Sequence, residues 1–236
     1  MARQAVILAA GMGTRLGRPF PKPLTELADG QSIMQQQVGK LLHAYPGVRV
    51  MIVVGFKRDL IMEAFPDVAF AYNEFYDQTN TSKSLLKALR LSGDGGVLWL
   101  NGDVVFDERI LTRVQDRIDA ERSFVCVNTA AVGDEEVKYT VDGDGFIKEL
   151  SKTVTGALGE AVGINFVSAA DKPVLIDALA VVADDDYFER GIEVAIADSG
   201  LRVEPIDISD LFAVEVDFEA DLERANQIGT GAGDTE

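Results

Sequence analysis

The sequence contains almost no cysteine or histidine. Its 236 residues include one cysteine, Cys126, and one histidine, His43. A single cysteine excludes a disulfide framework within the chain, and Cys126 lies between Val125 and Val127, as a small core residue would. The sequence also offers no Ser-His or Cys-His arrangement, which argues against covalent catalysis through a protein nucleophile.

Positive charge and long apolar stretches are scarce as well. There are 22 Lys and Arg residues against 39 Asp and Glu residues, which gives a net charge of -17 at pH 7. Because nucleic acids and anionic membranes are polyanions, this charge argues against both as partners, although a small pocket of cations can still hold a nucleotide. No apolar run approaches the length that spans a membrane, and the N-terminal run is too short for a signal peptide. We therefore expect a cytoplasmic protein.

Length and composition favour one domain. With 47% hydrophobic residues, a chain of 236 residues can bury a full core. We predict a single domain over residues 1–228. The remaining residues, 229–236, are small and polar, and we expect them to form a disordered tail.

The most informative stretch is residues 5–24, AVILAAGMGTRLGRPFPKPL. Its apolar run, Ala5 to Ala10, is too short for a helix and is typical of a strand buried on both faces of a parallel sheet. The glycines that follow let the backbone approach a ligand closely, and prolines stiffen the segment that carries Lys22. Cations beside exposed amides suit a polyphosphate. The residues concerned are Gly11, Gly13, Gly17, Thr14, Arg15, Arg18, Lys22, Pro19, Pro21 and Pro23.

Neither of two familiar phosphate-binding motifs matches this loop. The dinucleotide fingerprint requires a glycine where Leu16 stands, and the P-loop requires a Gly-Lys-Ser/Thr sequence that the stretch lacks. A strand followed by a solvated basic turn is the plain structural alternative. The three cations and three prolines around the glycines weigh against it.

Strand-like and helix-like segments alternate after this loop. Short apolar runs recur at 48–54, 68–72, 96–100 and 123–127, and helical patterns lie between them. This alternation predicts an α/β fold with a mostly parallel sheet flanked by helices. The Asp-Gly steps of VDGDG then predict an antiparallel hairpin from strands at 136–140 and 146–150, with a further strand at 159–166.

Two polar features follow predicted strands. Asp103 comes after the strand at 96–100 and after Gly102, where it can bind a hard cation such as Mg²⁺ or cap the next helix. The polar segment 73–84 also follows a strand, at the edge where open α/β sheets bind ligands. Within that segment, Thr81 or Ser82 can equally cap the following helix.

The sequence LAAGMGTRL followed by PKPL resembles the signature of nucleotidyltransferases with a GT-A-type fold, which join a nucleoside triphosphate to a sugar phosphate or alcohol phosphate. The resemblance extends from about Gln4 to about Gln227. It implies a Rossmann-like (GT-A-type) sheet, contacts from Arg15 and Lys22 to the triphosphate, and Mg²⁺ held by Asp103 and Asp217. For Asp217 the alternative is an N-cap. The nucleotide-binding residues that it implies are Leu8, Ala9, Ala10, Gly11, Gly13, Thr14, Arg15, Lys22, Asn80 and Ser82.

In this family the hairpin and the next strand cover the acceptor. The acceptor-site candidates are accordingly Lys138, Lys152, Glu160 and Tyr76, although Lys138 also fits a solvated strand face. Sugar-phosphate members commonly carry Glu-Lys-Pro here, whereas this chain has Ser151-Lys152-Thr153, and GEAVGI at 159–164 resembles cytidylyltransferases that use phosphocholine. We therefore expect CTP and a small phosphorylated acceptor such as phosphocholine. Aromatic faces, from Tyr72, Phe75 and Tyr76, and the Glu160 carboxylate would suit its ammonium group.

Other activities stay open at this stage. A sugar-1-phosphate nucleotidyltransferase that uses UTP or dTTP would share the loop. A GT-A glycosyltransferase would not need the segment between Arg15 and Lys22 and would show a closer Asp-x-Asp pair. A non-catalytic nucleotide-binding module would tolerate loss of Asp103 and Asp217, which are both present. Molybdenum-cofactor-type nucleotidyl transfer shares the early loop, but the hairpin and GEAVGI weigh against it.

Overall fold

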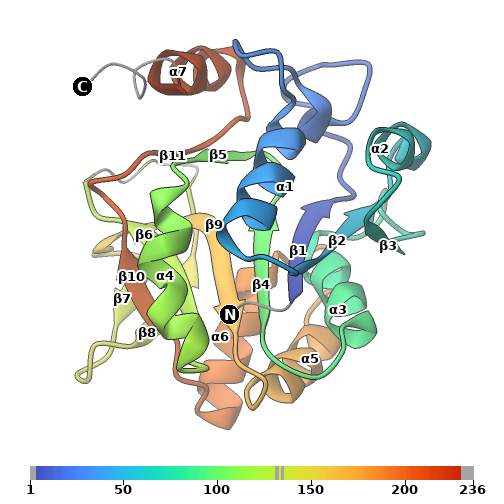
Figure 1. Ribbon diagram of the computed structural model, residues 1–236. Helices are drawn as coiled ribbons and strands as arrows, with labels where there is room; N and C mark the ends of the chain where they lie inside the picture. The colour runs from blue at the N-terminus through green and yellow to red at the C-terminus, as the bar shows by residue number, and fades with distance from the viewer. Residues whose placement is uncertain (1–3, 131–132, 134–135, 230–236) are drawn as a thin grey trace.

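The structure is a computed structural model that describes residues 4–130, 133 and 136–229 (Figure 1). The strands of its main sheet are β1 (Gln4–Ala9), β2 (Arg49–Val54), β3 (Ala69–Tyr72), β4 (Val97–Asn101), β6 (Phe124–Asn128), β9 (Gly159–Val167) and β10 (Glu204–Asp207). They lie in the order β10-β6-β9-β4-β1-β2-β3. β9 runs antiparallel to β4 and β6, and the other neighbours in this order are parallel. The predicted mostly parallel sheet is confirmed.

Helices cover both faces of this sheet (Figure 1). They are α1 (Ile33–Ala44), α2 (Arg58–Ala64), α3 (Thr81–Leu91), α4 (Arg109–Asp119), α5 (Lys172–Val181), α6 (Phe188–Ser199) and α7 (Glu219–Gly229), with a short 3-10 helix, η1, at Lys22–Leu24. α1 and α4 pack on one face through side chains such as Leu41 and Val114. α3, α5 and α6 pack on the other face through side chains such as Leu85, Leu179 and Ile192.

The apolar run that precedes the glycine loop is explained by this layering. Ile7 of β1 packs into the core on the α1 side, whereas Val6 and Leu8 pack into the core on the α3 side. Successive strand residues point to opposite faces, so a strand covered on both sides is apolar at every position. β1 is therefore an inner strand of the sheet, and the glycine loop follows its carboxyl end.

Antiparallel pairs complete the fold. β7 (Lys138–Val141) and β8 (Ile147–Ser151) form the predicted hairpin, and β7 also pairs with β9. β5 (Val104–Phe106) pairs with β11 (Ala213–Glu215) in a separate two-stranded sheet. The sequence analysis did not predict β5, because three residues directly after another strand are too few to show a periodicity.

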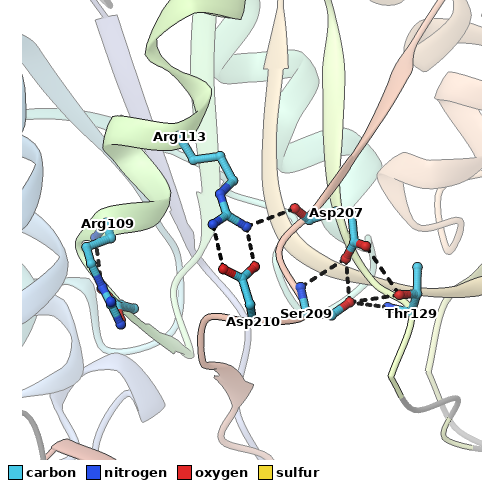
Figure 2. Close-up of polar contacts among 7 residues, drawn as sticks. Arg109, Arg113, Thr129, Asp207, Ser209 and Asp210 are labelled. Carbon is cyan, nitrogen blue, oxygen red and sulfur yellow. Dashed lines mark hydrogen bonds and ion pairs between the residues drawn. The ribbon is translucent and has the colours of Figure 1, made fainter.

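The connection between β10 and β11 is tied to the rest of the molecule by polar side chains (Figure 2). Arg113 of α4 forms a two-pronged ion pair with Asp210, with 2.7 Å between Nη2 and Oδ2. The backbone N–H of Ser209 donates to Asp207, and the Ser209 hydroxyl accepts from the backbone N–H of Thr129 at 2.8 Å. These contacts join α4, the end of β6 and the segment that leads into β11, so they help to fix where β11 lies.

The last helix packs beside the β5–β11 pair. Leu222 and Ala225 of α7 share a small core with Val105 and Val216. α7 includes Gly229, one residue beyond the predicted domain, and the rest of the predicted tail, 230–236, lies outside the described residues. Within the described ranges, no helix is both long and apolar enough to cross a membrane.

Candidate active site

The glycine loop forms one wall of a cavity of about 380 Å³ at the carboxyl ends of β1 and β4. Gly13 has a φ of +58°, and a Cβ at this position would lie 2.8 Å from Cβ of Lys22. Glycine is thus needed both for the backbone conformation and for the close approach of the proline-flanked segment that carries Lys22. The predicted residues that line this wall are Leu8, Ala9, Gly11, Gly13, Thr14, Arg15 and Lys22.

The loop reaches two aspartates that are far from it in sequence. The ammonium nitrogen of Lys22 lies 2.5 Å from Oδ2 of Asp103 and 2.6 Å from Oδ1 of Asp217. Arg15 donates to the other oxygen of Asp217 at 2.8 Å. All four side chains line the cavity, so the predicted phosphate-contacting and metal-binding residues converge on one point.

Strand pairing explains why the two aspartates meet. Asp103 lies between β4 and β5, and Asp217 follows β11 by two residues. Because β5 and β11 pair antiparallel, the two chain segments continue side by side, and the N–H of Val216 donates to the carbonyl of Asp103 at 3.0 Å. The small sheet therefore positions both carboxylates against the loop.

The charges of this cluster are mutually stabilised. Burial by itself would lower the pKa of Lys22, but the carboxylates of Asp103 and Asp217 outweigh burial and raise it above its usual value. Burial would raise the pKa of Asp217, and the hydrogen bonds and charges of Lys22 and Arg15 lower it instead. A lysine cation and an aspartate anion are therefore maintained at neutral pH.

The donor set fits a divalent cation that is bound partly by a substrate. Both aspartates direct an oxygen at the ammonium group of Lys22. Oδ1 of Asp103 is buried and has no hydrogen-bond partner among the described residues. Mg²⁺ is usually held by one or two carboxylates together with substrate phosphates. No cluster of three or more His, Cys, Asp or Glu side chains suited to a metal occurs in the described part of the chain. Asp103 and Asp217 are thus the residues that could hold magnesium.

The rest of the cavity lining is rich in carboxyl groups and includes an aromatic ring. Lys152 lies just after β8, and its ammonium nitrogen is 5.2 Å from the centroid of the Tyr187 ring. Glu215 of β11 accepts from Nδ2 of Asn101 at 3.2 Å. This part of the lining comprises Asn101, Glu136, Lys152, Tyr187, Phe188, Glu189 and Glu215.

Burial changes the protonation of these glutamates. It raises the pKa of Glu189 to about 7, and it raises the pKa of Glu215 well above its usual value, with further repulsion from Asp103. Burial and the neighbouring Glu160 carboxylate also raise the pKa of Glu136. This part of the lining therefore holds groups that change charge readily when a cation or a proton approaches.

The segment predicted to contact the base lies only partly at the cavity. Asn80 lines it, and its side chain accepts from the N–H of Thr81 at 2.8 Å as the N-cap of α3. The alternative that this segment caps a helix is thus correct, although the cap is Asn80 and neither Thr81 nor Ser82. Thr81 lines the cavity, whereas Ser82 is fully buried on α3 away from it. Ala10 is also buried outside the lining, and its carbonyl accepts from Phe56.

Of the predicted acceptor residues, Lys152 lines the cavity and three others do not. Glu160 turns toward a neighbouring pocket and accepts from the N–H of Gly133 at 2.9 Å. Lys138 donates to the carbonyl of Lys152 at 3.4 Å. The ring of Tyr76 packs at 6.4 Å from that of Phe56.

The other aromatic residues expected around the ammonium group, Tyr72 and Phe75, do not line the cavity either. The guanidinium of Arg58 covers the Tyr72 ring at 4.2 Å, and Phe75 is an exposed residue outside the cavity lining. Tyr72 ends the edge strand β3 and Phe75 follows it, and neither side chain reaches the cavity.

The sequence analysis did not single out three further residues that line the cavity, Tyr187, Glu189 and Glu215. Glu215 carried a usable signal, because in VEVD it alternates with Asp217 and side chains two apart on a strand share a face. Glu189 carried none, since an acidic residue in the first turn of a helix is typical of an exposed side chain beside the helix dipole. Tyr187 precedes the same helix and gave no pattern of its own.

A glycine loop, a lysine between two aspartates and a cavity at the strand ends are together typical of nucleotidyltransferases. Residues 5–151 match the model of the MobA-like NTP transferase domain, and the chain belongs to this family. The CMP-5'-(3-aminopropyl)phosphonate synthase of Streptomyces rubellomurinus is 29% identical over 94% of this chain and 38% of the relative. The bifunctional protein GlmU of Acidithiobacillus ferrooxidans is 39% identical over 44% of this chain and 23% of the relative. The chain thus spans well under half the length of these relatives.

Solved structures share the fold over nearly their whole length. The inositol-1-phosphate CTP transferase of T. maritima has a TM-score of 0.77 at 18% identity, and the alignment covers 98% of this chain and 97% of that one. The CTP:phosphocholine cytidylyltransferase of Streptococcus pneumoniae has a TM-score of 0.75 at 20% identity, with coverage of 97% and 99%. The GT-A-like nucleotidyltransferase fold expected from the sequence is confirmed.

Proposed function

We propose that the protein is a nucleotidyltransferase that transfers CMP from CTP to a small phosphorylated acceptor with an amino group and releases pyrophosphate. The observation that carries the proposal is the position of Lys22, which contacts Asp103 and Asp217 within the cavity that the glycine loop lines. A triphosphate needs cationic side chains and backbone amides, and this arrangement offers both next to two metal-competent carboxylates.

The chemistry is an in-line displacement at the α-phosphorus of the nucleotide. A phosphate or phosphonate oxygen of the acceptor forms the new P–O bond, while the bond from the α-phosphorus to the bridging oxygen breaks and pyrophosphate leaves. No protein nucleophile takes part, so the chain acts by holding both substrates in line and by stabilising the charge on the transferring phosphate. Lys22 and Arg15 contribute that stabilisation, and Gly11 and Gly13 let the triphosphate approach the backbone.

Magnesium bound to Asp103 and Asp217 would supply Lewis-acid stabilisation of the phosphate oxygens. With magnesium on the aspartates, Lys22 would be free to contact the triphosphate. Because Lys22 and Arg15 are paired with Asp103 and Asp217 within the cavity, a triphosphate needs additional positive charge to bind there. Magnesium dependence follows as part of the proposal.

Two features support CTP and an amino-bearing acceptor. The relative from Streptomyces is a synthase of a CMP-linked aminopropylphosphonate, and Ser151-Lys152-Thr153 replaces the Glu-Lys-Pro of sugar-phosphate enzymes. Lys152 is suited to the phosphate or phosphonate of the acceptor, and the surrounding carboxyl groups are suited to its amine. A cytoplasmic location agrees with the use of CTP.

A sugar-1-phosphate acceptor with UTP or dTTP is the alternative that the same fold accommodates. The experiment that separates the two is a pyrophosphate-release screen that crosses CTP, UTP, dTTP, GTP and ATP with phosphocholine, phosphoethanolamine, 3-aminopropylphosphonate, inositol phosphate and sugar 1-phosphates. We expect the fastest release with CTP and an amino-bearing acceptor. Preference for a sugar 1-phosphate would overturn the acceptor, and no release in any combination would overturn the activity.

A further inference from the structure

The carboxyl group of Glu189 is buried in the wall of the cavity with one oxygen unsatisfied. Glu189 is the second residue of α6, is 7% exposed, and lines the cavity. Its Oε2 has no hydrogen-bond partner among the described residues. An unpaired buried carboxylate oxygen is costly, because it has lost water without gaining another donor. A ligand that brings a donor or a cation to this wall would remove that cost.

Tyr187 supplies a second cation-binding feature on the same wall. It precedes α6, lines the cavity, and is 41% exposed. Its ring already interacts with a cation, since the ammonium nitrogen of Lys152 lies 5.2 Å from the ring centroid. A ring face attracts ammonium groups through its quadrupole and needs no N–H donor from them. The ring and the Glu189 carboxyl thus offer two kinds of attraction to one positive group.

We propose that Glu189 and Tyr187 bind the ammonium group of the acceptor and select for acceptors that carry one; this assignment rests on the proposed function. Lys152, close to both, is left to bind the phosphate or phosphonate. The acceptor class is therefore a short alkyl phosphate or phosphonate with a terminal primary or quaternary amine. We propose these residues in place of Glu160, Tyr72, Phe75 and Tyr76, none of which lines the cavity.

The charges around Glu189 make its response to pH informative. Three groups interact electrostatically with Glu189: the ammonium group of Lys152, after β8, and the carboxyl groups of Glu193, on α6, and Glu215, on β11. With its pKa raised to about 7 by burial, the Glu189 carboxyl is partly protonated at neutral pH. An amine acceptor should therefore bind more tightly at pH 8 than at pH 6, because Glu189 is more fully ionised at pH 8. An uncharged isostere should not gain affinity from the ionisation of Glu189.

The test compares phosphocholine with its uncharged isostere, 3,3-dimethylbutyl phosphate, and phosphoethanolamine with propyl phosphate, at saturating CTP and Mg²⁺. In Glu189→Gln we expect KM for the two amine acceptors to rise on the order of tenfold and KM for the isosteres to change little. Tyr187→Leu should have the same selective effect, and Tyr187→Phe, which keeps the ring, should not. Asp177→Asn removes a negative charge at an exposed position of α5 outside the cavity lining, and should behave as the parent.

The outcomes separate the inference from the proposed function. An equal loss for amine acceptors and isosteres in Glu189→Gln would mean that Glu189 only holds Lys152, and would overturn the inference. A parent that transfers CMP to a sugar phosphate and not to either amine would also overturn it and leave nucleotidyl transfer intact. A parent that releases no pyrophosphate with any acceptor would overturn the proposed function itself.

Discussion

The ammonium nitrogen of Lys22 lies 2.5 Å from the carboxylate of Asp103, in the position that a cation shared by Asp103 and Asp217 would take. The lysine comes from the glycine loop after β1, and the aspartates come from the ends of β4 and β11. In the proposed reaction, a metal bound to these carboxylates would release Lys22 toward the triphosphate, and a triphosphate bound to Lys22 would release the carboxylates to the metal.

Lys22 and Arg18 belong to the same loop and should differ in importance. Arg18 pairs with Glu219 at 2.9 Å and does not line the cavity. Lys22→Ala should reduce kcat roughly 10²-fold or more, the scale of one lost transition-state donor, and Arg18→Ala should cost much less. Steady-state pyrophosphate release measures both. Equal losses would show that the loop acts only as a diffuse positive field.

The aspartates should be required for turnover and not for folding. Asp103→Asn and Asp217→Asn keep the shape of the side chain but weaken the metal site, so kcat should fall by orders of magnitude while the circular dichroism spectrum is unchanged. A chelator should abolish the activity of the parent. Near-normal turnover in either variant would remove that residue from the proposed ligand set.

Two glycines of the loop provide a matched pair. Gly13 and Gly17 both have positive φ, but a Cβ meets Lys22 at Gly13 and meets nothing within 4 Å at Gly17. Each Gly→Ala change should destabilise the fold by about 1 kcal/mol through backbone strain, as judged by urea unfolding. Activity should fall strongly in Gly13→Ala alone, because only there is Lys22 displaced. A similar loss of activity in Gly17→Ala would contradict this explanation.

Burial of Glu189 predicts how stability changes with pH. Burial raises the pKa of Glu189 to about 7 in the folded protein, so the folded state keeps a proton on this carboxyl group that the unfolded chain loses near the ordinary pKa of glutamate. The free energy of unfolding therefore falls as the pH rises through 7. Relative to the parent, Glu189→Gln should therefore gain up to about 3 kcal/mol in free energy of unfolding between pH 4.5 and pH 8. Urea titrations at both pH values measure this difference. Parallel curves for the two proteins would show that Glu189 is not desolvated as the structure has it.

The sequence predicted the layers of the fold and half of the site for identifiable reasons. β1 is apolar at every position because helices cover both of its faces, and that pattern is visible without a structure. The glycine loop, Arg15 and Lys22 are adjacent in sequence, so their shared role was readable from one stretch. Asp103 and Asp217 were each found at the end of a strand, but their contact depends on the β5–β11 pairing, which three-residue strands do not reveal.

The proposed acceptor residues were predicted less well because their positions depend on tertiary packing. Glu160 and Lys138 are neighbours on the paired strands β9 and β7, yet Glu160 lines a different pocket. Tyr187 and Glu189 lie at the start of α6. Their local sequence does not show whether this first turn is buried in the cavity wall or exposed to solvent. Which side of an element faces a cavity is decided by the elements packed around it.

The fate of the nucleotide phosphates is the most direct test of nucleotidyl transfer in this cavity. The parent protein is incubated with an amino-bearing acceptor and Mg²⁺, and with CTP labelled at either the α- or the γ-phosphorus. The proposed reaction places the α-label in the acceptor product and the γ-label in pyrophosphate in equal amounts, and neither transfer occurs in Asp103→Asn. Release of a nucleoside diphosphate, or full transfer by the Asp103→Asn variant, would contradict the proposed reaction.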